Sequence, residues 1–306
     1  MSDCIEKANK WRKDWAKNDA KRDADLVEPE NVKKLVDIYY ADNMIDEDNA
    51  VENKESKDHL ADIYYPENVN VEKYPVIVSI HGGGWFYGDK ELYRHYAIHM
   101  ATLGFAVVNF NYRLSPENKY PCGFTDVCYL MDYLARNADK YQLDMNRFFV
   151  VGDSAGAQLC SQYSIFATNP SYRKLFDKLD YLKAPVPTKI ALNCGIYDME
   201  ERSKGEDVIC SWYLPEDMPE NDKESFYHVI DYVTSDFPET YLMLSVNDDL
   251  KECTKAMKDK LEEHKISFMY KEFGQDNPDD GHVFHLNMRS KNGKICNDEE
   301  AEFFVG

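Results

Sequence analysis

The strongest indication of the fold comes from the segment Phe148-Phe149-Val150-Val151-Gly152-Asp153-Ser154-Ala155-Gly156. Its first four residues form an apolar run of strand length, and a helical stretch follows from Ala155. The two glycines that flank the serine suit a turn so tight that side chains there would clash, so we expect a strand, a sharp turn and a helix. The turn would lift the Ser154 hydroxyl above the sheet, at the positive end of the helix. Ser154 is therefore a candidate nucleophile.

Apolar runs of strand length recur on both sides of this stretch and alternate with helical segments. Strands are expected at 76–80, 106–110, 147–152, 189–193, 240–246 and 267–272, with short strands ending near Tyr40 and Tyr65; helices are expected at 3–24, 92–103, 124–139, 155–168 and 251–264. Buried strands that alternate with helices predict an α/β fold with a mostly parallel central sheet and helices on both faces. We expect residues 1–306 to form one domain.

The segment 199–237 interrupts the alternation. It is acidic, carries Trp212 and Tyr213, and would be a long excursion between two strands. Long excursions in compact domains are often lids or binding segments. We therefore expect residues 199–237 to form a small cap, rather than a surface pair of helices without a role.

Composition and charge exclude several classes of partner. Asp and Glu number 56 against 36 Lys and Arg, a net charge of −20, which disfavours nucleic acid and anionic membrane surfaces. The eight cysteines form no Cys-x-x-Cys pair, no stretch is long and apolar enough to span a membrane, and the first 25 residues lack the apolar core of a signal peptide. A cytoplasmic, reduced protein is expected, unless an export signal has been removed. The sequence does not indicate the oligomeric state.

A second motif, His81-Gly82-Gly83-Gly84-Trp85, follows the expected strand 76–80. Three glycines allow backbone N–H groups to point into a cavity, and such donors stabilise the oxyanion of acyl-transfer intermediates. The N–H groups of Gly83, Gly84 and Ala155 would form this oxyanion hole. A phosphate-binding loop is disfavoured because no Lys-Ser/Thr follows. We expect His81, Trp85 and Asp153 to contact the substrate.

A nucleophilic serine needs a histidine base and a carboxylate that orients it, in the order acid then histidine. Asp248 and Asp249 follow the expected strand 240–246, and His282 and His285 lie beyond the last strand. We favour Asp248 and His282 and keep Asp249 and His285 as rivals. The aspartates could also be turn or helix-capping residues.

Other polar side chains give weaker signals. His95 and His99 are spaced to share a helical face, but no third metal ligand is evident, so we expect no metal and no cofactor. His59 has no supporting context in the sequence. Asp126 is expected to be a solvated or capping charge.

The ordered motifs resemble the hormone-sensitive-lipase-like branch of the α/β-hydrolases, the acetyl esterases and short-chain carboxylesterases. The match comprises the His-Gly-Gly-Gly-Trp motif, Tyr112-Arg113-Leu114-Ser115-Pro116-Glu117, Tyr120-Pro121 and Gly152-Asp153-Ser154-Ala155-Gly156. It is close over 76–168 and thinner to Leu286. The family's Asp-Pro-Leu is Asp248-Asp249-Leu250 here, and the approach to His282 is longer than usual.

The resemblance implies a Ser154–His282–Asp248 triad, no cofactor, and a cap built from residues 1–30 with 199–237. It also implies hydrolysis of small acyl esters, including acetyl, short-chain or feruloyl esters. The rivals are an amidase, formamidase or peptidase with the same triad, and a binding protein without catalytic activity. All triad candidates are present, which disfavours the binding protein.

Overall fold

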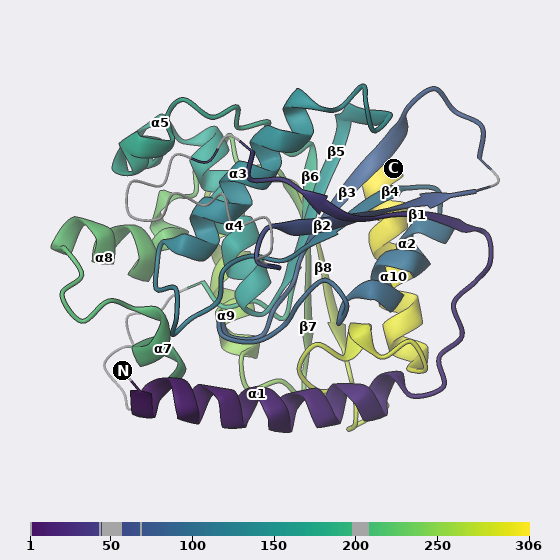
Figure 1. The fold of residues 1–306 in the computed structure, drawn as a ribbon, viewed down its shortest axis with the longest axis horizontal. Helices are drawn as coiled ribbons and strands as arrows, with labels where there is room; N and C mark the ends of the chain where they lie inside the picture. The colour runs from purple at the N-terminus through teal and green to yellow at the C-terminus, as the bar shows by residue number, and fades with distance from the viewer. Residues whose placement is uncertain (1, 43, 45–56, 68, 198–207) are drawn as a thin grey trace.

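A twisted sheet of eight strands runs through the centre of the described residues, in the order β1-β2-β4-β3-β5-β6-β7-β8 (Figure 1). The computed structural model describes residues 2–42, 44, 57–67, 69–197 and 208–306. The strands are β1 Val32–Tyr39, β2 Leu60–Pro66, β3 Tyr74–Ile80, β4 Ala106–Phe110, β5 Leu143–Asp153, β6 Lys189–Asn193, β7 Glu239–Ser245 and β8 Phe268–Phe273. Strand β2 pairs antiparallel with β1 and β4, and the other pairs are parallel. The prediction of a mostly parallel sheet is confirmed.

Helices cover both faces of the sheet because alternate strand residues point to opposite sides. The helices are α1 Ser2–Asp23, α2 Arg94–Thr102, α3 Cys122–Arg136, α4 Ala155–Thr168, α5 Pro170–Arg173, α7 Val208–Tyr213, α8 Glu220–Tyr227, α9 Lys251–Glu263 and α10 Lys291–Val305, with 3-10 turns η1 Lys174–Leu179, η2 Val229–Tyr232 and η3 Phe284–Leu286. Ile77 belongs to the buried cluster that includes residues of α2 and α10, whereas its neighbour Val78 belongs to the cluster that includes residues of α3, α4 and α9. Helix α1 lies along one end of the molecule beside α7 (Figure 1).

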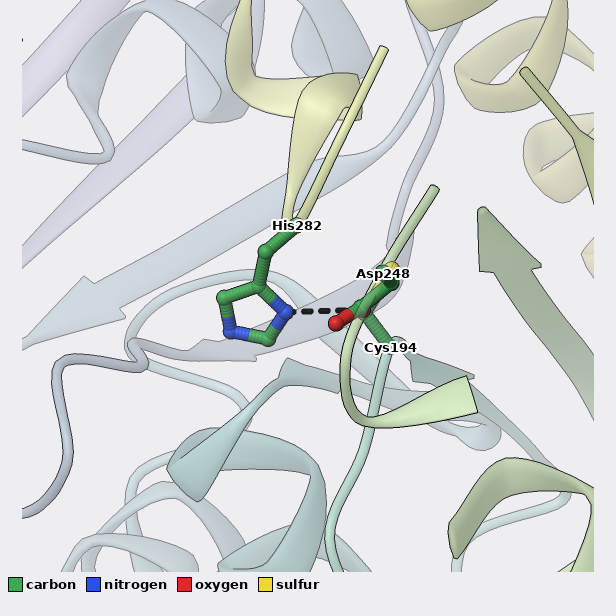
Figure 2. Close-up of side chains that lie close together, drawn as sticks. All are labelled: Cys194, Asp248 and His282. Carbon is green, nitrogen blue, oxygen red and sulfur yellow. Dashed lines mark hydrogen bonds and ion pairs between the residues drawn. The ribbon is translucent and has the colours of Figure 1, made fainter. Parts of the chain in front are cut away.

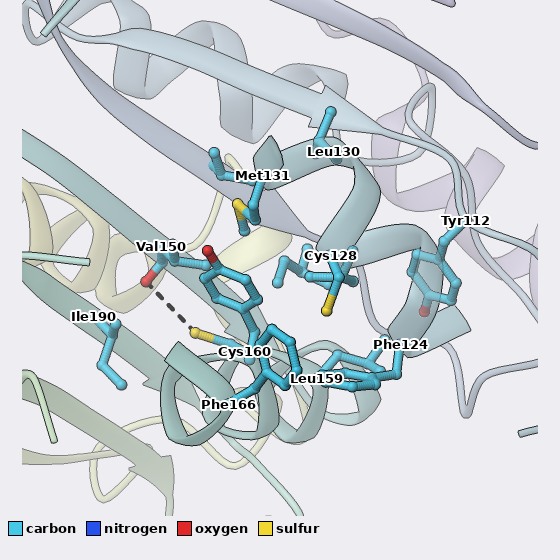
Figure 3. Close-up of a cluster of buried hydrophobic side chains, with 14 of the residues drawn as sticks. Tyr112, Phe124, Cys128, Leu130, Met131, Val150, Leu159, Cys160, Phe166 and Ile190 are labelled. Carbon is cyan, nitrogen blue, oxygen red and sulfur yellow. Dashed lines mark hydrogen bonds between the residues drawn. The ribbon is translucent and has the colours of Figure 1, made fainter. Parts of the chain in front are cut away.

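The core between α3 and α4 is shown in Figure 3. Phe124, Cys128 and Phe166 pack there without exposure to solvent, and the thiol of Cys160 contacts the carbonyl oxygen of Val150 at 3.7 Å. Each fully buried apolar side chain of this size contributes about 1.5–3 kcal/mol. None of the eight cysteines forms a disulfide bond. Within the described part of the chain, no helix has the length and apolar character needed to cross a bilayer.

The sequence pattern missed helix α10. Its inward face carries Asn297 and Glu300, both completely buried. These polar side chains interrupt the apolar stripe by which an amphipathic helix is recognised. Strand β5 also begins four residues before the expected strand 147–152. Its first half contains the exposed polar residues Asn146 and Arg147, which interrupt the apolar run used to predict it.

The prediction that Asp126 is a solvated or capping charge is wrong. Asp126 is completely buried in α3, where Arg113 donates to Oδ1 from Nη2 at 2.8 Å and to Oδ2 from its backbone N–H at 2.7 Å. The Nε2 atom of buried His59 lies 3.1 Å from Oδ1. Burial alone would raise the pKa of Asp126, but His59 and Arg113 outweigh it and hold the pKa below its usual value. The matched pair of charges explains how an aspartate occupies the core.

Asp126→Asn should lower the free energy of unfolding by about 3–5 kcal/mol, because the buried Arg113 cation loses the negative charge of this partner. Urea denaturation measures this. The matched control is Asp144→Asn, which breaks a pair with Arg147 whose side chain is 54% exposed, and should cost no more than about 1 kcal/mol. Equal losses in both variants would contradict the assignment. Because the folded pKa of Asp126 is lowered, its contribution is present above the ordinary pKa of 3.8 and disappears as the pH falls further.

Candidate active site

Ser154 occupies the sharp turn between β5 and α4. Its backbone has φ 53° and ψ −121°, an uncommon conformation for a residue with a side chain. A Cβ atom on Gly152 would lie 2.2 Å from the carbonyl oxygen of Gly156, and one on Gly156 would lie 2.1 Å from that of Ile80. Both positions therefore require glycine. The backbone N–H of Ser154 donates to the carbonyl oxygen of Asn193 at 3.0 Å, which ties the turn to β6.

His282 lies between Ser154 and Asp248. Its Nε2 atom is 2.9 Å from Ser154 Oγ, and its Nδ1 atom is 2.8 Å from Asp248 Oδ2. Figure 2 shows the imidazole ring directed at the Asp248 carboxylate. Asp248 follows β7, His282 follows β8, and Ser154 follows β5, so the carboxyl ends of three parallel strands bring the side chains together.

The Asp248 carboxylate is held in a defined orientation. Its side chain is 1% exposed, and its Oδ1 atom accepts the backbone N–H of Leu250 at 2.8 Å. Burial raises the pKa of Asp248. The hydrogen bond with His282 and the other donors lower the pKa by more than burial raises it, so the pKa lies below the usual value. The group is thus a carboxylate at neutral pH, able to accept the Nδ1–H of His282.

The two rivals occupy different places. Asp249 is exposed and lines the same cavity, but the imidazole of His282 pairs with Asp248. His285 is buried, and its ring packs edge-on against Tyr96 at 5.9 Å. Burial lowers the pKa of His285 to about 3. The structure therefore brings together Ser154, His282 and Asp248, and leaves Asp249 and His285 outside this line of hydrogen bonds.

The glycine loop after β3 faces the serine. Gly83 and Gly84 have φ of +104° and +59°, and both line the cavity with Ala155 and Ser154. The carbonyl oxygen of Gly83 turns away to accept the N–H groups of Phe86 and Tyr87, at 3.2 and 2.9 Å. A Cβ on Gly83 would lie 2.1 Å from the carbonyl oxygen of Tyr87, so the close approach requires glycine.

Of the three residues expected to contact substrate, two line the cavity. Trp85 and Asp153 do so, although each is at most 3% exposed. The expectation for His81 is corrected: the residue is completely buried, does not line the cavity, and stacks on Tyr112 at 4.1 Å. Its ring supports the glycine loop from behind, because the His81 Nδ1 atom lies 2.8 Å from the carbonyl oxygen of Gly82.

Tyr93, which the sequence did not indicate, joins the glycine loop to the serine turn. Its hydroxyl accepts the backbone N–H of Gly82 at 2.8 Å and donates to Asp153 Oδ2 at 2.8 Å. Burial raises the pKa of Asp153 to about 6, although the Tyr93 hydrogen bond acts in the opposite direction. One buried hydroxyl thus sets the distance between the loop that carries Gly83 and the turn that carries Ser154.

Tyr93→Phe should lower kcat by about tenfold, or about 1.4 kcal/mol, because the buried Gly82 N–H loses its acceptor and the loop can shift. Steady-state kinetics on an aryl ester measures the effect, and KM should change little. Tyr87→Phe is the control, since the Tyr87 hydroxyl bonds Asp19 on α1 instead. A larger kcat loss in Tyr87→Phe than in Tyr93→Phe would contradict this role.

The cavity above Ser154 has a volume of about 630 Å³. Its outer wall comes from α1, through Trp15, Asn18, Asp19 and Arg22, and from α7, through Ile209 and Cys210. Trp11 and Trp15 anchor α1 against Phe86 and Trp212 with ring centroids 4.8–6.3 Å apart. Within the segment 199–237, residues 199–207 lie outside the described part of the chain.

Comparison of the sequence with models of known protein families identifies the family of this chain. The BD-FAE family model matches residues 61–258. The chain belongs to the BD-FAE family. This match and the esterase relatives also confirm the predicted resemblance to hormone-sensitive-lipase-like α/β-hydrolases.

Two curated relatives illustrate the similarity in sequence. Carboxylesterase NlhH of Mycobacterium tuberculosis is 36% identical over 89 residues, which cover 29% of this BD-FAE chain and 28% of that protein. The acetyl esterase of Salmonella schwarzengrund is 23% identical over 210 residues, 64% of this chain and 62% of that protein. The chain spans less than a third of the length of the first curated relatives that it matches.

Solved structures show that the fold is that of α/β-hydrolases. Esterase B from Lactobacillus rhamnosis superposes with a TM-score of 0.83 at 21% identity, over 100% of this BD-FAE chain and 96% of that chain. A bacterial heroin esterase gives 0.72 at 22% identity, over 96% and 89% of the two chains. The predicted fold class is confirmed.

Proposed function

We propose that this protein is a serine carboxylesterase that hydrolyses small acyl esters through Ser154, His282 and Asp248. The observation that carries the proposal is the continuous line of hydrogen bonds from Asp248 through His282 to Ser154, at 2.8 and 2.9 Å, which ends in a cavity. A serine acquires nucleophilic character from a base so placed, and the base from its carboxylate. The names of NlhH and of the Salmonella relative support an ester substrate.

The first half of the reaction forms an acyl-enzyme. Asp248 accepts the Nδ1–H of His282, which leaves the Nε2 lone pair directed at Ser154. As Ser154 Oγ attacks the ester carbonyl carbon, Nε2 takes the hydroxyl proton and the carbonyl oxygen becomes an oxyanion. The tetrahedral intermediate then collapses, and the alcohol leaves with the proton from Nε2.

The second half releases the acid. Water enters the position of the departed alcohol, gives a proton to His282 Nε2, and attacks the acyl carbon. Collapse of the second intermediate returns that proton to Ser154 Oγ. In both halves, the N–H groups of Gly83, Gly84 and Ala155 stabilise the oxyanion, and each such donor is worth about 3–4 kcal/mol of barrier.

The cavity wall supports a cap made of α1 and α7. Trp15 and Ile209 line the cavity from the two helices, and the aromatic contact of Trp11 with Trp212 joins α1 to α7. A cap that excludes water strengthens electrostatic interactions within the site. The cavity, at about 630 Å³, admits an acetyl, short-chain or feruloyl ester together with part of its alcohol.

A panel of aryl esters tests the proposal. Hydrolysis rates are measured for acyl groups from acetyl to long-chain, with feruloyl esters and acetylated xylan beside them. A fluorophosphonate probe is applied in parallel, and mass spectrometry locates the modified residue. Turnover of at least one ester with labelling at Ser154 is expected. Labelling elsewhere, or none with no turnover across the panel, would refute the proposal.

A further inference from the structure

Cys194 is a buried thiol next to the two residues that activate Ser154. It follows β6, its side chain is completely buried, and its backbone N–H donates to the carbonyl oxygen of Met243 at 2.8 Å. Its φ is +49°, a rare value for a residue with a side chain. Asp248 and His282 line the cavity, whereas Cys194 does not, so the sulfur approaches the pair from the protein interior. Figure 2 shows the three side chains converging.

The sulfur is in contact with both loops that carry the activating residues. The Cys194 thiol donates to Met243 Sδ at 3.9 Å, and its sulfur lies close to the Asp248 carboxylate and to the backbone of Ser245 and Val283. Ser245 ends β7 just before the acid loop, and Val283 directly follows His282. The sulfur therefore lies beside both the loop that carries Asp248 and the loop that carries His282.

The three side chains offer one ligand atom each, and these atoms all lie within 4.8 Å of one another. Thiolate, imidazole and carboxylate are the ligand types that Zn²⁺ takes in proteins, with bonds of about 2.0–2.3 Å. A tetrahedral zinc ion with such bonds holds its ligand atoms roughly 3.3–3.8 Å apart. The site would form with a small widening of the 2.8 Å Asp248–His282 separation and a movement of the sulfur by about 1 Å or less.

We propose that Cys194, Asp248 and His282 form an inhibitory site for a thiophilic divalent cation, with Zn²⁺ as the best-fitting ion. This inference rests on the proposed function, because the same Asp248 and His282 activate Ser154 there. The fourth coordination position faces the cavity, through which the ion enters, since the His282 side chain is 39% exposed. Hard cations such as Mg²⁺ and Ca²⁺ prefer oxygen ligands and are excluded by this donor set.

Inhibition follows from the proton balance. Zn²⁺ takes the sulfur as a thiolate, so the thiol proton leaves to solvent. It also takes the lone pair of Nδ1, so the single proton of the neutral imidazole moves from Nδ1 to Nε2. His282 Nε2 then carries a proton and faces Ser154 as a donor, so it cannot accept the hydroxyl proton. No electron is transferred, and a chelator reverses the process.

Matched cysteine variants test the site in the full-length protein. Ester hydrolysis is titrated with ZnCl₂ for the wild type, Cys194→Ser, Cys194→Ala and Cys210→Ser, with MgCl₂ as the ion control. Cys210 also lines the cavity but is not among the three ligands, so it reports on nonspecific thiol binding. Both Cys194 variants should raise the inhibition constant for Zn²⁺ by at least about tenfold, while Cys210→Ser should keep the wild-type value.

A second measurement does not depend on activity. Co²⁺ replaces Zn²⁺ in such sites, and a thiolate ligand gives it an intense charge-transfer absorption. Wild type and Cys210→Ser should show this band, and Cys194→Ser should lack it; thermal melting confirms that each variant is folded. The band would appear even if the protein hydrolysed no ester, so failure of the proposed function and failure of this inference are distinguishable.

Each outcome decides the proposal. A cobalt thiolate band that requires Cys194, together with weaker zinc inhibition in its variants, supports it. Equal zinc inhibition in the wild type and both Cys194 variants overturns it, because the ion then binds without the sulfur. The absence of a band at millimolar Co²⁺ also overturns it.

Discussion

Ser154→Ala should lower kcat by about four to six orders of magnitude, because no other group replaces the attacking oxygen. The Oγ atom has its hydrogen bond with His282, whose side chain is partly exposed, so its loss leaves no buried donor without an acceptor. The variant should therefore keep the fold and the wild-type melting temperature. Steady-state kinetics on the best aryl ester of the panel, with active-site titration, measures the loss.

Binding provides the control for this variant. Ser154→Ala keeps the cavity and the N–H groups of Gly83, Gly84 and Ala155, so a slow or non-hydrolysable ester analogue should bind with nearly unchanged affinity. Fluorophosphonate labelling should vanish. Turnover within tenfold of the wild type would show that another group attacks the ester, and would sink the assignment of the nucleophile.

Asp248→Asn should lower kcat by roughly 10⁴-fold, whereas Asp249→Asn should change it by no more than a few-fold. The asparagine can present its amide N–H₂ to Nδ1, which favours the tautomer with the proton on Nε2. That tautomer cannot accept a proton from Ser154. Asp249→Asn is the matched control. It removes the same charge from the same loop and cavity, whereas the imidazole of His282 is paired with Asp248.

The pH profile of kcat/KM distinguishes the two variants further. In the wild type, Asp248 remains a carboxylate in mild acid because its pKa lies below the usual value, so protonation of this group should not lower kcat/KM in that pH range. Asp249→Asn should retain the wild-type profile. A large loss in Asp249→Asn with little change in Asp248→Asn would reverse the assignment of the acid.

The local sequence contained most of the fold. Strands β4 and β6 and helix α4 have the bounds that the apolar runs predicted. Nearly every residue in each of them is buried, so the apolar run and the element coincide. The turn at Ser154 was also predictable, since only glycine fits at Gly152 and Gly156. Helix α10 was missed because its buried face includes Asn297 and Glu300, whose partners come from distant segments: Glu300 accepts the side chain of Asn193 at 2.8 Å.

Choices between neighbouring residues required the tertiary structure. The sequence offered Asp248 with Asp249 and His282 with His285, and a shift of one residue in the first pair or three in the second decides which side chain faces the serine. Pairing of β7 and β8 fixes the directions of both loops, so Asp248 and His282 meet while His285 is buried against Tyr96. The buried roles of Asp126 and Tyr93 depend likewise on partners 11 to 67 residues away in the chain.

The order of residues along the chain thus predicts that Ser154 stands on a strand–turn–helix motif, with a glycine loop upstream and an acid and a histidine downstream. These features are local, because backbone conformation at a tight turn is limited by the sterics of a few adjacent residues. The tertiary structure alone decided which acid and which histidine reach the serine, that His81 lies behind the loop, and that the Cys194 sulfur lies beside both. Such contacts form between chain segments that only the packing of the parallel strands brings together.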